Sequence, residues 1–152
     1  MTAARILGRN VPRVDGYVKV TGKAEFAGDL VVPGMLHGKV LRSHLPHARI
    51  VRVAVSAAEN LPGVVAVLTG NDLLDLKNWR YGHAIKDRPI VAVDRVRFVG
   101  EPVAAVAAEN AHIAHEALRL IEVEYDDLPV VGTLDASLAA GAFQLHDMAS
   151  LR

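Results

Sequence analysis

The chain has 152 residues, 51% of them hydrophobic, which fits one folded domain and argues against intrinsic disorder. Lys and Arg number 17, as do Asp and Glu, so the formal net charge is zero and lacks the basic excess typical of nucleic-acid-binding proteins. The absence of cysteine excludes disulfides, thiol catalysis and iron–sulfur ligation by this chain. With no apolar stretch of membrane-spanning length and no secretory signal at 1–10, we expect a cytoplasmic location.

Short strands are predicted in the first third of the chain. Val18 and Val20 alternate with Lys19 after a turn at Asp15-Gly16, and Ala24–Asp29 forms a second alternating piece. After the turn at Pro33-Gly34 we expect a strand over Met35–Arg42.

Clearer signals follow from residue 48 onward. Ala48–Val55 alternates and predicts a half-buried strand. Ser56 and Glu59 have the spacing of a capping box and predict a short helix that ends at Pro62-Gly63. Val64–Leu68 is a continuous β-branched run, which indicates a buried strand, and a helical turn is expected at 71–74.

The polar stretch 75–89 is predicted to be a long surface loop. Ile90–Val93, Val96–Val99 and Val103–Ala107 read as strands, the last of them buried.

A single strong helix is predicted over Ala111–Ile121, with Asn110 as its N-cap and an apolar stripe at helical spacing. Ile121–Tyr125 then alternates as a strand, and a further helix is expected at Asp135–Ala140. Because strands do not alternate regularly with helices, the pattern favours an α+β fold with a bent, partly barrel-like, mixed sheet and two or three helices.

Histidines are the main candidates for site chemistry. His112 and His115 share a helical face and could hold a divalent metal, although the helix's apolar stripe leaves them toward solvent, and we favour a solvated face. His44 and His47 flank Leu45-Pro46 between two strands, where a ligand-binding role is weighed against simple turn exposure, which we favour.

Other polar features give little sign of catalysis. The acidic run Glu122, Glu124, Asp126 and Asp127 reads as a solvated strand edge rather than a catalytic carboxylate pair. Glycine-rich phosphate loops and a Gly-x-Ser-x-Gly elbow are absent from the sequence. Glu101, just before a buried strand, is either a paired charge at an interface or an ordinary turn residue.

Several motifs together resemble the large, molybdenum-binding subunit of the xanthine dehydrogenase and aldehyde oxidase family. The motifs are Pro12-Arg13-Val14-Asp15-Gly16, Lys19-Val20-Thr21-Gly22-Lys23-Ala24-Glu25-Phe26, Leu41-Arg42-Ser43 with His47-Ala48-Arg49-Ile50, Leu61-Pro62-Gly63-Val64 with Val67-Leu68-Thr69-Gly70, Val96-Arg97-Phe98-Val99-Gly100-Glu101-Pro102-Val103-Ala104, and Glu122-Val123-Glu124-Tyr125 within 114–128. They run in family order over nearly the whole chain. The family often has a proline where His44 stands, so the turn at that point is expected to differ.

The resemblance implies an α/β hammerhead domain over residues 5–131, followed by a connection or tail at 132–152. Complete enzymes of this family hydroxylate aromatic heterocycles or oxidise aldehydes with molybdenum–pterin, two [2Fe–2S] clusters and FAD. Their pterin loops and catalytic glutamate lie beyond the hammerhead, so the resemblance carries over no catalytic, cofactor-binding or metal-binding residue, and the chain alone is expected to be inactive.

Two functions remain open at this point. The chain is either the non-catalytic N-terminal domain of a molybdenum hydroxylase large subunit, or a stand-alone interaction module or truncated gene product without redox activity. In the first case its partners would be the remaining molybdenum-binding domains and the Fe–S and FAD subunits or domains. Self-association is expected if a native interface is exposed. As that interface we predict the apolar turn of Phe98 and Val99 beside Gly100, Glu101 and Pro102, along with the tail from Val130.

Overall fold

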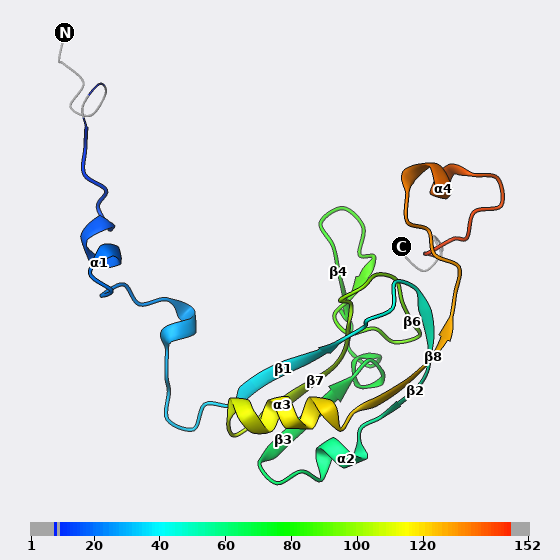
Figure 1. Cartoon of the computed structure of the whole chain (residues 1–152), viewed down its shortest axis with the longest axis horizontal. Helices are drawn as coiled ribbons and strands as arrows, with labels where there is room; N and C mark the ends of the chain where they lie inside the picture. Colours follow the sequence, from blue (N-terminus) through cyan, green and yellow to red (C-terminus); the bar gives the residue numbers. More distant parts are fainter. Residues whose placement is uncertain (1–7, 9, 147–152) are drawn as a thin grey trace. The chain divides into compact units, whose positions relative to one another are not determined.

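A computed structural model describes residue 8 and residues 10–146, so residues 5–7 and 9 of the expected hammerhead span, and 147–152 of the expected tail, lie outside the described residues. The chain divides into two units, Met1–Met35 and Leu36–Arg152 (Figure 1).

The N-terminal unit carries the helix α1 (Gly16–Val20) and a 3-10 turn, η1 (Ala27–Asp29). The strand expected around Val18–Val20 is therefore wrong. This segment has no strand partner among the described residues, and local bonds favour a helical turn instead. Asp15 pairs with Lys19 one turn later, at 2.5 Å, and neither short helix buries a residue.

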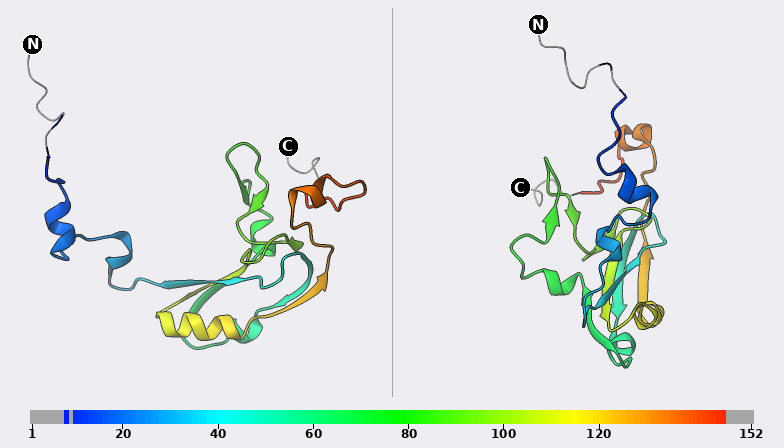
Figure 2. Two further views of the ribbon diagram at one scale, coloured as in Figure 1. Left: turned by 45° about the horizontal axis from the view of Figure 1, so that its top comes forward. Right: turned by 90° about the vertical axis from the view of Figure 1, so that its left-hand side faces the viewer.

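The larger unit is built from antiparallel strands (Figures 1 and 2). The first sheet has the order β1-β7-β3, from β1 (His37–Arg42), β7 (Pro102–Ala108) and β3 (Val64–Thr69). The second has the order β6-β2-β8, from β6 (Arg95–Val96), β2 (Ala48–Ala54) and β8 (Glu122–Asp127). These two sheets take the place of the one bent, mixed sheet that the sequence suggested, within the α+β class that it indicated.

Helix α3 (Ala111–Arg119) packs on one face of the first sheet and forms the main core (Figure 1). Its Ala114 and Ala117 lie against Ala104, Val106 and Ala108 of β7, all buried. The predicted cap is confirmed, because the Asn110 side chain accepts a hydrogen bond from the Ile113 amide at 2.9 Å. A second core cluster, of Ala48, Ala92, Val96 and Val103, joins the start of β7 to the second sheet.

Some local predictions fail for identifiable reasons. The short helix α2 (Ser56–Glu59) exists, but Val55 is its N-cap and no side chain caps it, so the capping box is wrong. Strand β3 lies at a sheet edge, with Val65 56% exposed, and is not the buried strand expected. Val91 and Ala92 are buried, but 90–93 forms no strand.

The expected surface loop at 75–89 contains a small hairpin. Its strands are β4 (Arg80–Tyr81) and β5 (Arg88–Pro89), and they follow the short 3-10 turn η2 (Asn71–Leu73). Beyond the second sheet, helix α4 (Leu134–Leu138) buries no residue, although the segment after it, 142–146, is partly covered.

Candidate interaction site

The turn between β6 and β7 is held by backbone hydrogen bonds on both sides. Gly100 has a φ of +93°, a conformation that favours glycine. Its amide donates to the Ser43 carbonyl at 2.8 Å, and the Ser43 amide donates to the Glu101 carbonyl at 2.9 Å. The Arg42 guanidinium donates to the Gly100 carbonyl at 2.8 Å. These bonds tie the turn to the end of β1, so its backbone is rigid.

Glu101 fastens the turn from the inside. Its side chain is only 2% exposed and accepts a hydrogen bond from the backbone amide of Arg97. Burial raises the pKa of the Glu101 carboxyl, while the bond from the Arg97 amide and the Arg97 charge act against that rise. The sequence left Glu101 open as either a paired charge at an interface or an ordinary turn residue. The structure shows a turn residue that is buried and whose carboxyl group is bonded to the backbone.

The tip of this turn presents two apolar side chains to the surface. Phe98 is 46% exposed and Val99 is 63% exposed. Glu101 is buried and Pro102 is half-buried at the start of β7. Of the five residues predicted as an interface, Phe98 and Val99 can therefore contact a partner, while Glu101 holds them in position.

Arg97 connects this turn to the segment after α4. Its side chain donates to the Leu145 carbonyl at 3.1 Å and to the Arg95 carbonyl at 3.2 Å, and it lies 3.4 Å from the Asp94 carboxylate. Burial works against ionisation of Asp94, but the hydrogen bond from Arg95 and the charge of Arg97 lower its pKa. Burial and the Arg97 charge also lower the pKa of His146.

A pocket of about 240 Å³ lies where the turn, the hairpin and this segment meet. Its lining includes Phe98 and Glu101 from the turn, Asp87 and Arg88 from the hairpin, and Leu145 and His146. Arg97, which also lines it, already has its guanidinium bonded to neighbouring backbone. The pocket thus lies between three segments, and the Arg97 guanidinium in its lining is already hydrogen-bonded to neighbouring backbone.

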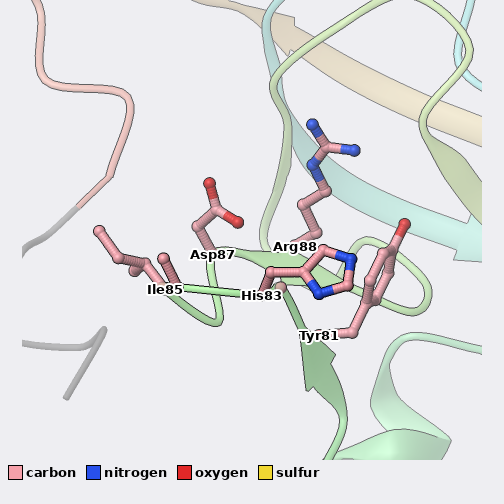
Figure 3. Close-up of a pocket in the computed structure, with 7 residues that line it drawn as sticks. Tyr81, His83, Ile85, Asp87 and Arg88 are labelled. Carbon is pink, nitrogen blue, oxygen red and sulfur yellow. The ribbon is translucent and has the colours of Figure 1, made fainter.

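The hairpin carries a larger but shallow hollow of about 730 Å³ (Figure 3). Figure 3 shows the rings of Tyr81 and His83 close to each other on the hairpin, with Ile85 directed away from them. The lining residues all come from 81–88, and most are exposed. Because no second element closes this hollow, it cannot exclude water from a bound molecule, and it is a poor candidate for a catalytic site.

The histidine candidates have separate surroundings. His112 and His115 are exposed on α3, as the solvated-face interpretation predicts. His44 is exposed, and its ring meets the Tyr125 ring edge-on at 5.8 Å between centroids. Among the described residues, no group of three His, Asp or Glu side chains is placed to hold a metal ion.

The expectation of turn exposure is wrong for His47, which is 2% exposed. Its Nδ1 lies 2.5 Å from the Pro129 carbonyl oxygen, and the Phe143 ring packs edge-on at 5.0 Å. Sequence reasoning missed this role because the contacts come from residues more than eighty positions later. His47 fastens the chain that leaves β8.

The acidic run behaves as predicted. Glu122, Glu124, Asp126 and Asp127 are all exposed on β8, an edge strand. Asp126 lies opposite Arg49 of β2, with 4.0 Å between their charged atoms. None of the helices in the described ranges has the length and apolar character needed to cross a membrane.

Comparison with known proteins identifies the domain. Residues 21–129 match the family model described as "Aldehyde oxidase and xanthine dehydrogenase, a/b hammerhead domain". A probable xanthine dehydrogenase subunit of Bacillus subtilis is 49% identical over 135 residues, which cover 89% of this chain and 18% of that protein. The nicotinate dehydrogenase large molybdopterin subunit of Eubacterium barkeri is 40% identical, over 93% of this chain and 33% of its own length.

Solved structures agree with this fold. CO dehydrogenase from Oligotropha carboxidovorans matches with a TM-score of 0.83 at 35% identity, over 89% of this chain and 17% of that one. Quinoline 2-oxidoreductase from Pseudomonas putida 86 matches with a TM-score of 0.77 at 38% identity, over 89% and 18%. This chain thus spans only a fifth to a third of the curated relatives it matches. It belongs to the aldehyde oxidase and xanthine dehydrogenase family, and the part of that family it matches is the a/b hammerhead domain.

Proposed function

We propose that this domain works as the non-catalytic N-terminal part of a larger molybdenum hydroxylase, where it supports the molybdenum-binding domains and takes part in subunit contacts. The observation that carries this role is the rigid β6–β7 turn, which displays Phe98 and Val99 while the buried Glu101 and the backbone bonds to Ser43 hold it. Exposed apolar side chains on a preorganised loop lose little conformational freedom on binding, which favours an interface.

An iron–sulfur cluster does not fit the residues of this domain. The sequence has no cysteine to ligate an iron–sulfur cluster, and the described residues offer no cluster of three metal ligands. By the family resemblance, the proposal places the molybdenum–pterin, the [2Fe–2S] clusters and the FAD of the parent enzyme outside this domain, and we derive no chemical step from it. The proposal includes a cytoplasmic location, with which the cysteine-free sequence is compatible.

The first test is the gene itself. A reading frame that continues past Arg152 into glycine-rich pterin-binding loops is expected, and a stop codon there would favour the stand-alone module instead. The second test is assembly of the complete polypeptide with its companion subunits, measured by gel filtration and molybdenum content.

The turn variant for that second test is Phe98→Asp with Val99→Asp. Both side chains are exposed in this domain, so the 152-residue chain should keep its melting temperature while the complete enzyme loses assembly. Val51→Asp is the matched control, because Val51 is 55% exposed on β2, next to Arg52. Normal assembly of the turn variant would contradict a role for this turn in the interface.

A further inference from the structure

One face of the first sheet is covered by α3. The opposite face is covered at Val103 by the second core cluster and is open beside Ala105 and Ala107. Along β7, Ala104, Val106 and Ala108 point toward α3 and are buried. Ala105 and Ala107 alternate to the other side, and both remain partly exposed although β7 is the central strand. Where this central strand is covered on one face only, it leaves apolar surface in contact with water.

The neighbouring strands extend this open face. Ala107 is paired with Gly38 of β1 and with Ala66 of β3, and Ala105 is paired with Val40 and Leu68. Directly paired residues share a face, so these six residues form one surface, which we call the open face. None of the six is charged, and Val40 is 40% exposed.

The second sheet provides a comparison, because its solvent-exposed surface carries charged pairs. There, Arg49 lies opposite Asp126 and Arg52 lies opposite Glu124, and all four side chains are exposed. Charged pairs and a charged edge strand keep such a surface soluble and prevent further strand pairing. The open face of the first sheet has no such pair, which indicates that it is covered in the assembled protein.

Gly38 is the sharpest feature of the open face. Its backbone lies outside the left-handed region, and an added Cβ would meet only the Val106 carbonyl oxygen, at 4.0 Å. Nothing within the described fold therefore requires a glycine there, although glycine weakens a strand. A glycine inside a strand often marks a bulge, a tight bend, or a place where a ligand or another backbone approaches closely, and the pairing of β1 with β7 has no register shift at Gly38. The row Gly38–Ala107–Ala66 has no side chain longer than a methyl group, so the approach is unobstructed.

We propose that the open face is packed in the complete enzyme against an apolar helix or strand from the remainder of the same large subunit. This inference rests on the proposed function. The comparison with relatives indicates which segment covers the open face. The chain covers only 18% of the Bacillus subtilis relative and 17% of the CO dehydrogenase chain, so such proteins contain a large remainder that could pack there. Most of such a polypeptide lies outside the hammerhead domain and is covalently attached to it.

A second copy of this domain is the weaker occupant. Six residues, four of them glycine or alanine, present far less surface than the roughly 1,200–2,000 Å² buried by stable interfaces between separate proteins. A covalently linked segment is held at high effective concentration and needs less buried area to remain docked. The small size of the open face thus favours a neighbour within the same polypeptide.

The test uses the lack of cysteine in this chain. Ala107→Cys places a thiol on the open face. Val51→Cys, at a 55% exposed position of β2 in the second sheet, is the matched control. Maleimide labelling of each site is followed by peptide mass spectrometry, in the 152-residue chain and in the complete polypeptide. We expect both sites to react in the 152-residue chain, and labelling of the Ala107→Cys site alone to fall at least about tenfold in the complete polypeptide.

Any other labelling result overturns the proposal that the open face is covered by the remainder of the same large subunit. Equal labelling of the Ala107→Cys site in both proteins means that the open face is not covered, while the role of the Phe98 turn stands or falls on its own assembly test. Slow labelling of the 152-residue chain that recovers on dilution assigns the face to a second copy. Protection that appears only when companion subunits are added assigns it to one of them. A gene that stops at Arg152 overturns this inference together with the proposed function.

Discussion

The buried side chain of Glu101 accepts a hydrogen bond from the backbone amide of Arg97 and so closes the loop that displays Phe98 and Val99. Burying a carboxylate is costly unless it is bonded. Because the donor is the backbone amide of Arg97, the bond stabilises the conformation of the turn. The buried Glu101 carboxylate thus belongs to the turn from which Phe98 and Val99 project. This hydrogen bond links the local fold to the proposed interface.

Replacing Glu101 with alanine should therefore destabilise the chain. The change leaves the Arg97 amide without its acceptor in a partly buried place, and we expect a loss of about 1–3 kcal/mol in the free energy of unfolding. Glu101→Gln keeps an oxygen acceptor and should lose much less. Urea denaturation of the three proteins checks this, and equal losses for both variants would show that the Arg97 bond is not the cause.

Glu101 also predicts a pH dependence. Because the pKa of Glu101 is raised above its ordinary value of 4.5, the folded protein binds this proton more tightly than the unfolded chain does. The stabilisation is fully present below the ordinary pKa and is lost as pH rises through the folded pKa. The wild-type chain should gain stability relative to Glu101→Gln as pH falls from 7 toward 4.5. Denaturation series on both proteins measure this difference, and a difference that does not change with pH would contradict it.

Predictions from the sequence succeeded where a pattern reflects local geometry. They failed where a residue's burial depends on contacts with residues far away in the sequence. The Asn110 cap and the alternation of Val123 and Tyr125 are set by neighbours within a few residues, and both were predicted. The burial of His47 depends on Pro129 and Phe143, which no local pattern reveals.

The same distinction explains the errors in strand placement. Val64–Leu68 has the β-branched composition of a buried strand, but its position at the edge of the sheet leaves Val65 exposed. At Val18–Val20 the alternating residues form a helical turn, and no strand in the described part of the chain pairs with them. The motif around Gly100 suggests residues for the proposed interface, but only the structure separates the exposed Phe98 from the buried Glu101.

The N-cap of α3 offers a direct stability test. Asn110→Ala removes the side-chain acceptor of the Ile113 amide and should cost about 1 kcal/mol, since α3 forms one side of the main core. Thr133→Ala is the matched control, because Thr133 accepts from the Ala136 amide in the same way but caps α4, which buries nothing. We expect less than about 0.5 kcal/mol for the control. Equal effects on the midpoint of urea unfolding would count against the central role of α3.

The exposed histidines of α3 should be dispensable. Replacing His112 and His115 with glutamine changes two solvated side chains, and the free energy of unfolding should move by no more than about 0.5 kcal/mol. Adding zinc should raise the melting temperature of neither protein. A zinc-dependent rise in the wild-type chain that disappears in the double variant would restore the metal-site interpretation.

Two glycines should respond in opposite ways to alanine, because one is enclosed by its own fold and the other faces open space. An added Cβ at Gly70 would lie 2.2 Å from the Ala92 carbonyl oxygen and 2.7 Å from the Val93 Cα, both backbone atoms that cannot move aside cheaply. Gly70→Ala should therefore cost about 1–3 kcal/mol or more, as overpacking does. At Gly38 the nearest atom is 4.0 Å away, so Gly38→Ala should leave the 152-residue chain unchanged or stabilise it by up to about 1 kcal/mol. Urea unfolding of both variants tests the pair. A large loss from Gly38→Ala in the 152-residue chain would mean that the glycine serves this domain's own fold, and would remove the argument that another backbone approaches it from outside.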